Sequence, residues 1–178
     1  VNYVLVLDGI INVDTIPGNG ASLSFGPQIT AGVYTIIAYN PLTNCNQLMN
    51  GSASIDAAPV SYNITPAGIA CVGDAIGLDN SEVGVNYQLQ LNGTINIGMP
   101  LTGNGSSLNF GVQTLTGTYT IIATNANGCV NQMNGPVVLN SMPAVYNITP
   151  VGSYCMGMNV GINGSEVGVN YILVLNSA

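Results

Sequence analysis

Four cysteines are the residues of this chain whose type and spacing most clearly allow chemistry. Cys45 and Cys129 lie 84 positions apart, and Cys71 and Cys155 repeat that interval (129 − 45 and 155 − 71). The chain contains no Cys-x-x-Cys pair and no His, so the cysteines do not have the spacing of a zinc site. A repeated pair of cysteines in a sparsely charged chain predicts disulfides and an oxidising compartment instead.

Four cysteines allow three pairings. We favour Cys71–Cys129, with Cys45 and Cys155 paired to cysteines outside the segment. In an immunoglobulin-like (Ig-like) sandwich the loop between the last two strands lies at the N-terminal end of the domain. Cys129 falls in such a loop, and Cys71 lies early in the same repeat. The alternative pairs Cys45–Cys71 and Cys129–Cys155 would join each repeat to the next, and four free thiols are the third interpretation.

The acids are the other candidates for chemistry, and their pattern argues against catalysis. Asp8 and Asp79 are replaced by Asn92 and Asn163 one repeat later, although a working carboxylate would not be dispensable in one copy. The chain also lacks an imidazole to transfer protons near neutral pH and a cation to stabilise an oxyanion. Asp79 and Glu82 together supply few of the oxygen ligands that a Ca²⁺ site needs. We therefore predict no catalytic residue, no metal site and no cofactor.

The composition limits the partners as well. The chain has no Lys or Arg, 7 acids, a net charge of −7 and a pI of about 4.1, so binding of nucleic acid through phosphate neutralisation is excluded. No apolar run reaches the roughly 20 residues that a membrane-spanning helix needs, so membrane insertion is not expected. With 47% apolar residues the chain does not have the composition of a disordered protein.

The elements that would position these side chains are repeated. The tripeptide Val-Asn-Tyr begins at Val1, Val85 and Val169, and a fixed long period indicates a repeated structural unit. Proline-marked breaks at Pro59 and Pro143 suggest where one unit ends and the next begins. We therefore expect a segment cut from a longer array. Its predicted ranges are 1–58 (the C-terminal part of one Ig-like repeat), 59–142 (a complete repeat) and 143–178 (the N-terminal part of the next).

Strand signals dominate each repeat, and no segment has sustained helical periodicity. Short β-branched or alternating runs are separated by Gly, Asn and Pro turns, and Asn127-Gly128 predicts a tight hairpin. Tyr34 and Tyr119 each open a Tyr-Thr-Ile-Ile strand and resemble a tyrosine corner, whose phenol bonds nearby backbone. The prediction is an all-β fold of tandem Ig-like antiparallel β-sandwich repeats of about 84 residues. The runs read as strands are Asn2–Asp8, Tyr87–Gly93, Ser107–Phe110, Thr118–Ala123, Pro136–Asn140 and Ala144–Ile148.

A family resemblance extends this interpretation. Gly84–Gly93, Gly117–Asn125 and Asn127-Gly128-Cys129 carry phrases that resemble the long tandem repeats of secreted Bacteroidota surface proteins, including giant adhesins of the gliding-motility kind. The resemblance implies Ig-like modules, export by the type IX secretion system, and a place on the cell surface or in an extracellular fibre. Asp14-Thr15-Ile16 is similar to the O-glycosylation motif of such proteins, which makes Thr15 a candidate acceptor.

These observations favour a structural repeat segment of an extracellular fibre or adhesin stalk that acts mechanically and is not an enzyme. Its partners would be neighbouring repeats of the same chain or identical chains. One alternative is an adhesive module that binds surface glycans through loops such as Gly103–Ser107. Another is a self-assembling filament subunit in which chain ends complete each other by strand addition.

Overall fold

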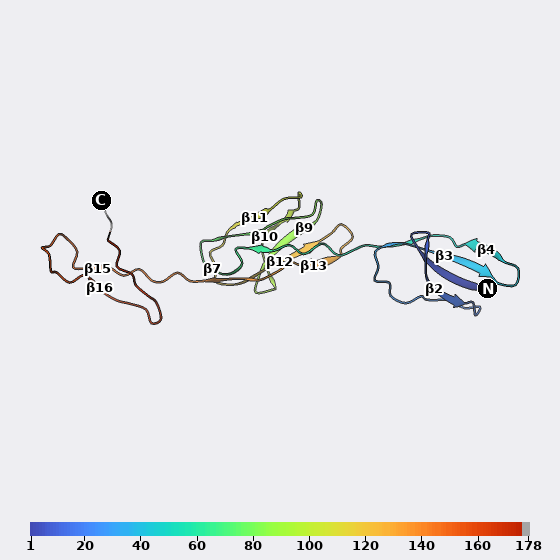
Figure 1. The fold of residues 1–178 in the computed structure, drawn as a ribbon, viewed down its shortest axis with the longest axis horizontal. Helices are drawn as coiled ribbons and strands as arrows, with labels where there is room; N and C mark the ends of the chain where they lie inside the picture. Colours follow the sequence, from blue (N-terminus) through green and yellow to red (C-terminus); the bar gives the residue numbers. More distant parts are fainter. Residues whose placement is uncertain (176–178) are drawn as a thin grey trace.

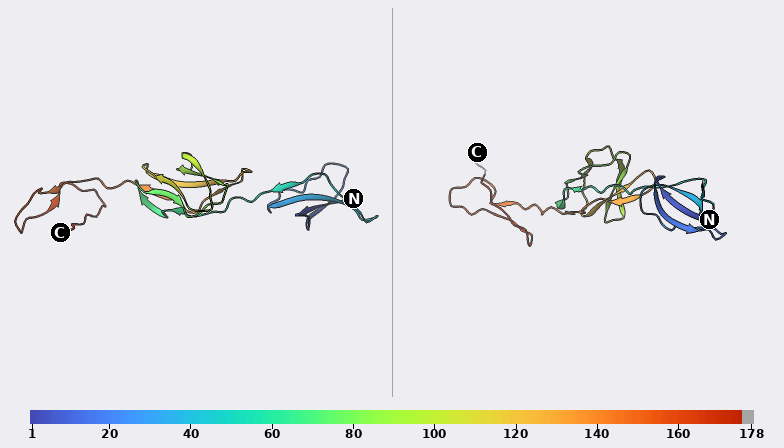
Figure 2. Two further views of the ribbon diagram at one scale, coloured as in Figure 1. Left: turned by 90° about the horizontal axis from the view of Figure 1, so that it is seen from above. Right: turned by 45° about the vertical axis from the view of Figure 1, so that its right-hand side comes forward.

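The computed structural model describes residues 1–175, and within them it contains strands and no helix. Three parts follow one another along the long axis of the molecule (Figures 1 and 2). All strand pairings fall within residues 2–55, 64–140 or 148–162. The predicted all-β class with antiparallel sheets in a sandwich is confirmed. Residues 176–178 of the third predicted range lie outside the described residues.

The middle module, whose paired strands span residues 64–140, contains two sheets that face each other. The larger is six-stranded, with the order β10-β9-β12-β14-β7 and β13 paired to β12, and the smaller has the order β11-β8-β6. The strands are β6 (Ile64–Thr65), β7 (Gly68–Cys71), β8 (Ala75–Leu78), β9 (Asn86–Leu91), β10 (Ile95–Thr102), β11 (Leu108–Val112), β12 (Gly117–Thr124), β13 (Val130–Gln132) and β14 (Val137–Asn140).

Alternation in the sequence explains why the core lies between these sheets. Side chains of successive strand residues point to opposite faces, and β9 alternates exposed or half-buried residues with the buried Tyr87, Leu89 and Leu91. Buried residues of β12 and β14 extend this layer, while Ile76 and Leu78 of β8 cover it from the smaller sheet. The core therefore needs strands from both the beginning and the end of the module.

The first part contains a single sheet with the order β2-β1-β3-β4, and β5 pairs with β3. Its strands are β1 (Asn2–Leu7), β2 (Ile11–Pro17), β3 (Gly32–Asn40), β4 (Cys45–Leu48) and β5 (Ala53–Ile55). These strands repeat the arrangement of β9, β10, β12, β13 and β14, but nothing in the first part corresponds to β6, β7 or β8. Its small core consists of Leu5, Leu7 and Tyr34 with half-buried neighbours.

The third part supplies the opposite half of a module. Its two strands, β15 (Ile148–Thr149) and β16 (Gly161–Ile162), form an antiparallel pair that copies β6 and the end of β8. The predicted strand over Ala144–Ile148 is wrong, because regular pairing begins only at Ile148. The amides of Ala144 and Asn147 instead donate to the side chains of Glu166 (2.7 Å) and Asn163 (2.9 Å).

The other strand predictions agree with the structure, but the two long strands β2 and β10 were missed. The predicted hairpin at Asn127-Gly128 is confirmed, since the Gly128 amide donates to the Asn125 carbonyl (3.1 Å) between β12 and β13. The register of β10 on β9 shifts between Ile97 and Leu101, and the pairing of β2 with β1 is also irregular. Gly98 and Pro100 lie in the irregular part of β10, and both residue types normally interrupt a strand.

Candidate functional site

The acids of the repeats act as fixed hydrogen-bond acceptors. Asp8 Oδ1 accepts the amide of Val33 (2.8 Å), and its copy Asn92 Oδ1 accepts the amide of Thr118 (3.0 Å). One carbonyl-type oxygen is all that this contact requires. Asp and Asn can therefore replace each other between copies, because either side chain supplies the oxygen that accepts this backbone amide.

A second acid shows the same equivalence of charge and amide. Asp79 accepts from the backbone (2.9 Å) and side-chain amide (2.7 Å) of Asn63, while its copy Asn163 accepts from the backbone of Asn147 (2.9 Å). Glu82 accepts the amide of Val60 (3.2 Å), so each of these two acids already holds a backbone group. In the part of the chain that the structure describes, no group of three or more potential metal ligands is present.

The predicted disulfide Cys71–Cys129 is wrong. Cys129 does lie at the N-terminal end of the middle module, with its thiol 3.8 Å from the carbonyl oxygen of Asp56. Cys71, however, ends β7 opposite Asn140, at the other end of the sheet. Cys129 lies near the end of β12 and Cys71 near its beginning, which are roughly 20 Å apart. A disulfide requires Cα atoms within about 7 Å of each other.

The alternative pairs Cys45–Cys71 and Cys129–Cys155 are not formed either, because all four thiols are free. Cys45 begins β4 and copies the position of Cys129, and Cys155 copies that of Cys71. Cys129 lies where the sequence predicted it. The predicted pairing is wrong because β7 carries the chain to the far end of the module before Cys71.

The two predicted tyrosine corners are present. The Tyr34 hydroxyl donates to the carbonyl of Thr30 (2.9 Å), and the Tyr119 hydroxyl donates to that of Leu115 (2.9 Å). Burial raises the pKa of Tyr119 above its ordinary value of 10.0, and burial likewise raises the pKa of Tyr87. Tyr87 and Tyr119 therefore both favour the neutral phenol.

Three asparagines in the loop between β12 and β13 and in β13 bind the chain segment that leads into the middle module. Asn125 donates to the Ala57 carbonyl (3.1 Å), Asn127 donates to the Asp56 carboxylate, and Asn131 donates to the Pro59 carbonyl (2.7 Å). Sequence reasoning read Asn127 as a turn residue and missed this role. Three asparagines within seven residues around a predicted module end were the available signal.

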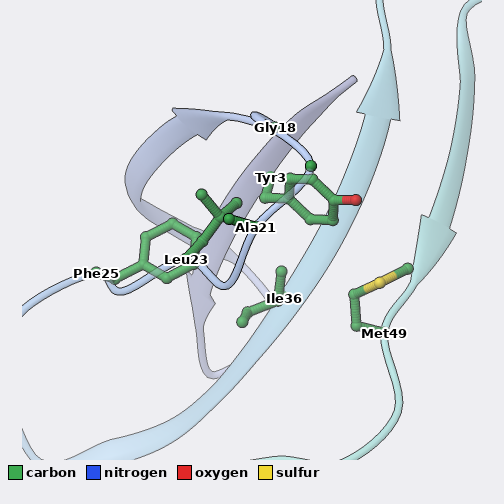
Figure 3. A pocket seen from close by; sticks show the side chains of 8 residues that line it. Tyr3, Gly18, Ala21, Leu23, Phe25, Ile36 and Met49 are labelled. Carbon is green, nitrogen blue, oxygen red and sulfur yellow. The ribbon is translucent and has the colours of Figure 1, made fainter.

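The first part exposes a hollow where the middle module has its core (Figure 3). Its volume is about 430 Å³, and apolar side chains from several segments converge on it. We call this surface the open face and define it by Tyr3, Leu23, Phe25, Ile36 and Met49. Residues 18–36 correspond to residues 103–121, at a spacing of 85 (103 − 18). The copies of Tyr3, Ile36 and Met49 are thus Tyr87, Ile121 and Met133, which are fully or almost fully buried. The open face is therefore core surface that nothing within residues 1–175 covers.

The remaining predicted site residues do not join the open face. Thr15 is exposed on β2 at the edge of the first sheet, where its amide donates to the Asp14 side chain (2.7 Å). In the loop Gly103–Ser107, Gly103 is buried, and the hydroxyl of Ser81 donates to the carbonyl of Ser106 (2.6 Å). That loop is bound to its own module, while its outer residues are exposed.

The described residues include no helix of the length and apolarity that crossing a bilayer requires. No family model and no curated protein matches the chain. Among solved structures, the chain is similar to Bacteroides ovatus mixed-linkage glucan utilization locus SGBP-B in complex with mixed-linkage heptasaccharide. The sequence identity is 13% and the TM-score is 0.34, over 82% of this chain and 40% of that one. A likeness at this level does not identify a shared fold or function.

Proposed function

We propose that the chain is a structural repeat segment of an extracellular fibre or adhesin stalk, and that it acts by bearing load along its length. The observation that carries this proposal is the parallel pairing of β7 with β14, the second strand and the last strand of the middle module. Gly68 to Cys71 lie in register with Val137 to Asn140. In this role no residue acts catalytically.

Parallel pairing of β7 with β14 has a mechanical consequence. Tension that enters through residues 56–61 pulls β7 toward one end of the module, and tension that leaves after Asn140 pulls β14 toward the other. The two strands must therefore slide past each other, which loads all hydrogen bonds of the ladder together. Antiparallel strands that are pulled from one end open one bond at a time.

The connection into the module supports the same role. Asn125, Asn127 and Asn131 bind successive groups of residues 56–59, so the joint to the preceding part is held by several hydrogen bonds. The resemblance to repeats of secreted Bacteroidota surface proteins is consistent with such a role and suggests a location at the cell surface. Arrays of this kind gain stability from each module and from its contacts with neighbours.

Single-molecule stretching of the chain from its two ends tests the load-bearing role. Val72→Pro removes the amide that donates to the Asn140 carbonyl (2.9 Å) and should lower the force at which the middle module unfolds. Val83→Ala is the matched control, since Val83 is 78% exposed. An unchanged unfolding force for Val72→Pro would contradict the proposal.

A glycan- or surface-binding adhesive module is the second candidate, and the open face favours it. Tyr3 and Phe25 place aromatic rings in an exposed hollow, where a sugar ring could stack. SGBP-B binds a mixed-linkage heptasaccharide, which makes a mixed-linkage glucan oligosaccharide a reasonable first probe. Titration followed by tyrosine fluorescence should show saturable binding that Phe25→Ala abolishes and Phe110→Ala, the same change in the middle module, leaves intact.

A further inference from the structure

We propose that the open face of the first part binds residues 143–168 of a second copy of this chain, so that two incomplete halves form one module by strand exchange. The inference rests on the structural role proposed above and names its partner. The repeat itself provides the argument, because the middle module shows how an equivalent segment occupies an equivalent face.

In the middle module, residues 59–84 cover the surface that residues 85–142 present. Ile64 and Ile76 of this segment are 2% and 1% exposed. Their copies in the third part, Ile148 and Val160, are 57% and 54% exposed. Apolar residues of the third part thus have the spacing of a core segment but no core beneath them within the described residues. The open face, whose residues copy that core, has the matching spacing.

The backbone pattern of the middle module gives the register of the proposed complex. There, the Ile64 amide donates to the Asn134 carbonyl (3.1 Å), and the Asn134 amide donates to the Tyr62 carbonyl (2.8 Å). Asn50 is the copy of Asn134, so its backbone should bind Tyr146 and Ile148 of the second copy. By the same correspondence β5 should pair in parallel with residues 152–154, as β14 pairs with β7.

A glycine in the third part points independently to the missing partner. A Cβ on Gly77 of β8 would lie 2.5 Å from the carbonyl oxygen of Leu108, which explains why this strand position is glycine. Its copy Gly161 has no such neighbour, since the nearest atom to a Cβ would be Thr149 Oγ1 at 3.7 Å. The copy of Leu108 is Leu23, on the open face. In the proposed complex, Leu23 of the other copy takes the place beside Gly161 that Leu108 has beside Gly77.

A glycine in the first part makes the reciprocal point. A Cβ on Gly103 would overlap the carbonyl oxygen of Glu82. Its copy is Gly18, and the copy of Glu82 is Glu166, which lies in the third part. Gly18 also has close neighbours in its own part, since a Cβ there would lie 2.9 Å from Tyr3 Cε2 and 3.3 Å from the Val1 carbonyl oxygen. The proposed complex would add the backbone of Glu166 to these neighbours.

The arrangement of the chain favours a second copy over closure of one chain on itself. The first and third parts lie at opposite ends of the long axis with the middle module between them (Figures 1 and 2). A second copy can bring its residues 143–168 to the open face without moving the middle module. The same contact can be repeated, which produces head-to-tail oligomers.

Sedimentation of the 178-residue chain over a range of concentrations tests the proposal. The wild type should form species at multiples of the single-chain mass of 18.2 kDa. Gly161→Ala should weaken association roughly tenfold or more, because its methyl group has room in the separate chain but would meet Leu23 of the partner copy. Val167→Ala is the matched control, since Val167 and its copy Val83 are both exposed and the oligomers should persist.

A mixing experiment guards against misfolding of one variant. Ile36→Asp disrupts the open face, and Gly161→Ala weakens the docking segment, so each variant alone should remain a single chain at concentrations where the wild type assembles. Their mixture should give a one-to-one dimer that grows no further, because one productive contact remains. A single-chain mass for the wild type at every concentration would overturn the inference, and so would unchanged assembly of Gly161→Ala.

A shortened chain sharpens the test. Residues 169–175 repeat residues 1–7 almost identically and would compete with β1 for its place beside β3. A chain ending at Gly168 should therefore assemble at least as well as the wild type, and loss of assembly would count against the register. The Val72→Pro stretching experiment probes contacts within one module. It therefore separates failure of this inference from failure of the load-bearing role.

Discussion

The middle module and the two parts beside it contain nearly the same residues in different surroundings. Tyr87 is fully buried, whereas its copy Tyr171 is 43% exposed and its copy Tyr3 is half-buried on the open face. The sequences of β9 and β1 do not explain this difference. Strands β6, β7 and β8 cover the core only in the middle module, so burial in this array is a property of the completed pair of sheets.

Truncation of matched core residues should reveal the largest difference in stability between the middle module and the first part. Ile121→Ala removes a fully buried side chain and should cost about 2–5 kcal/mol of unfolding free energy in the middle module. Ile36→Ala, the same change on the open face, should cost the separate chain much less, because Ile36 is only half-buried there. Urea unfolding of dilute protein measures both. Equal losses would show that the open face is already covered.

The next effect concerns the glycines that allow strands to approach closely. Gly77→Ala should destabilise the middle module by roughly 1–3 kcal/mol, because its Cβ meets the backbone of Leu108 and backbone yields less easily than a side chain. Gly161→Ala should leave the unfolding of dilute protein unchanged. Thermal melts of the two variants provide the comparison, and similar destabilisation by both would mean that Gly161 already has a close neighbour.

A smaller effect distinguishes charge from acceptor geometry. Asp79→Ala should cost about 0.5–1.5 kcal/mol, since it removes the exposed hydrogen bonds that Asp79 accepts from Asn63. Asp79→Asn should cost distinctly less, because Asn163 already performs this task in the third part. If the two variants are equally destabilised in urea, the carboxylate charge matters and the exchange between copies has another cause.

The sequence predicted what local patterns encode. Alternation located β9 and β12, the Tyr-Thr-Ile-Ile phrase located both tyrosine corners, and the 84-residue interval indicated a repeat. It could not predict the end of the module at which Cys71 lies, because that depends on the direction of β7 and its parallel pairing with a distant strand. The missed β10 shows the same limit, since a bulge there tolerates Gly98 and Pro100.

The open face could be read only partly from the sequence. Incomplete repeats predicted exposed strand edges, but they did not show which side chains gather at the hollow. Phe25 and Met49 come from segments far apart in the chain, and only the folded sheet brings them together (Figure 3). The asparagines at the module joint were missed for a similar reason, because their partners lie about 70 residues earlier in the chain.

The smallest effect near neutral pH is the dependence of the middle module's stability on alkaline pH, which reports on buried tyrosines of its complete core. Burial raises the pKa of Tyr87 and of Tyr119 above 10.0, so the folded middle module holds these protons more tightly than the unfolded chain does. Their contribution to stability is therefore fully present below pH 10 and is lost as the pH rises through the folded-state values. Urea unfolding at pH 8 and pH 11 should show a loss that Tyr119→Phe reduces, because phenylalanine has no proton to lose. An unchanged loss in Tyr119→Phe would assign the alkaline effect to other groups.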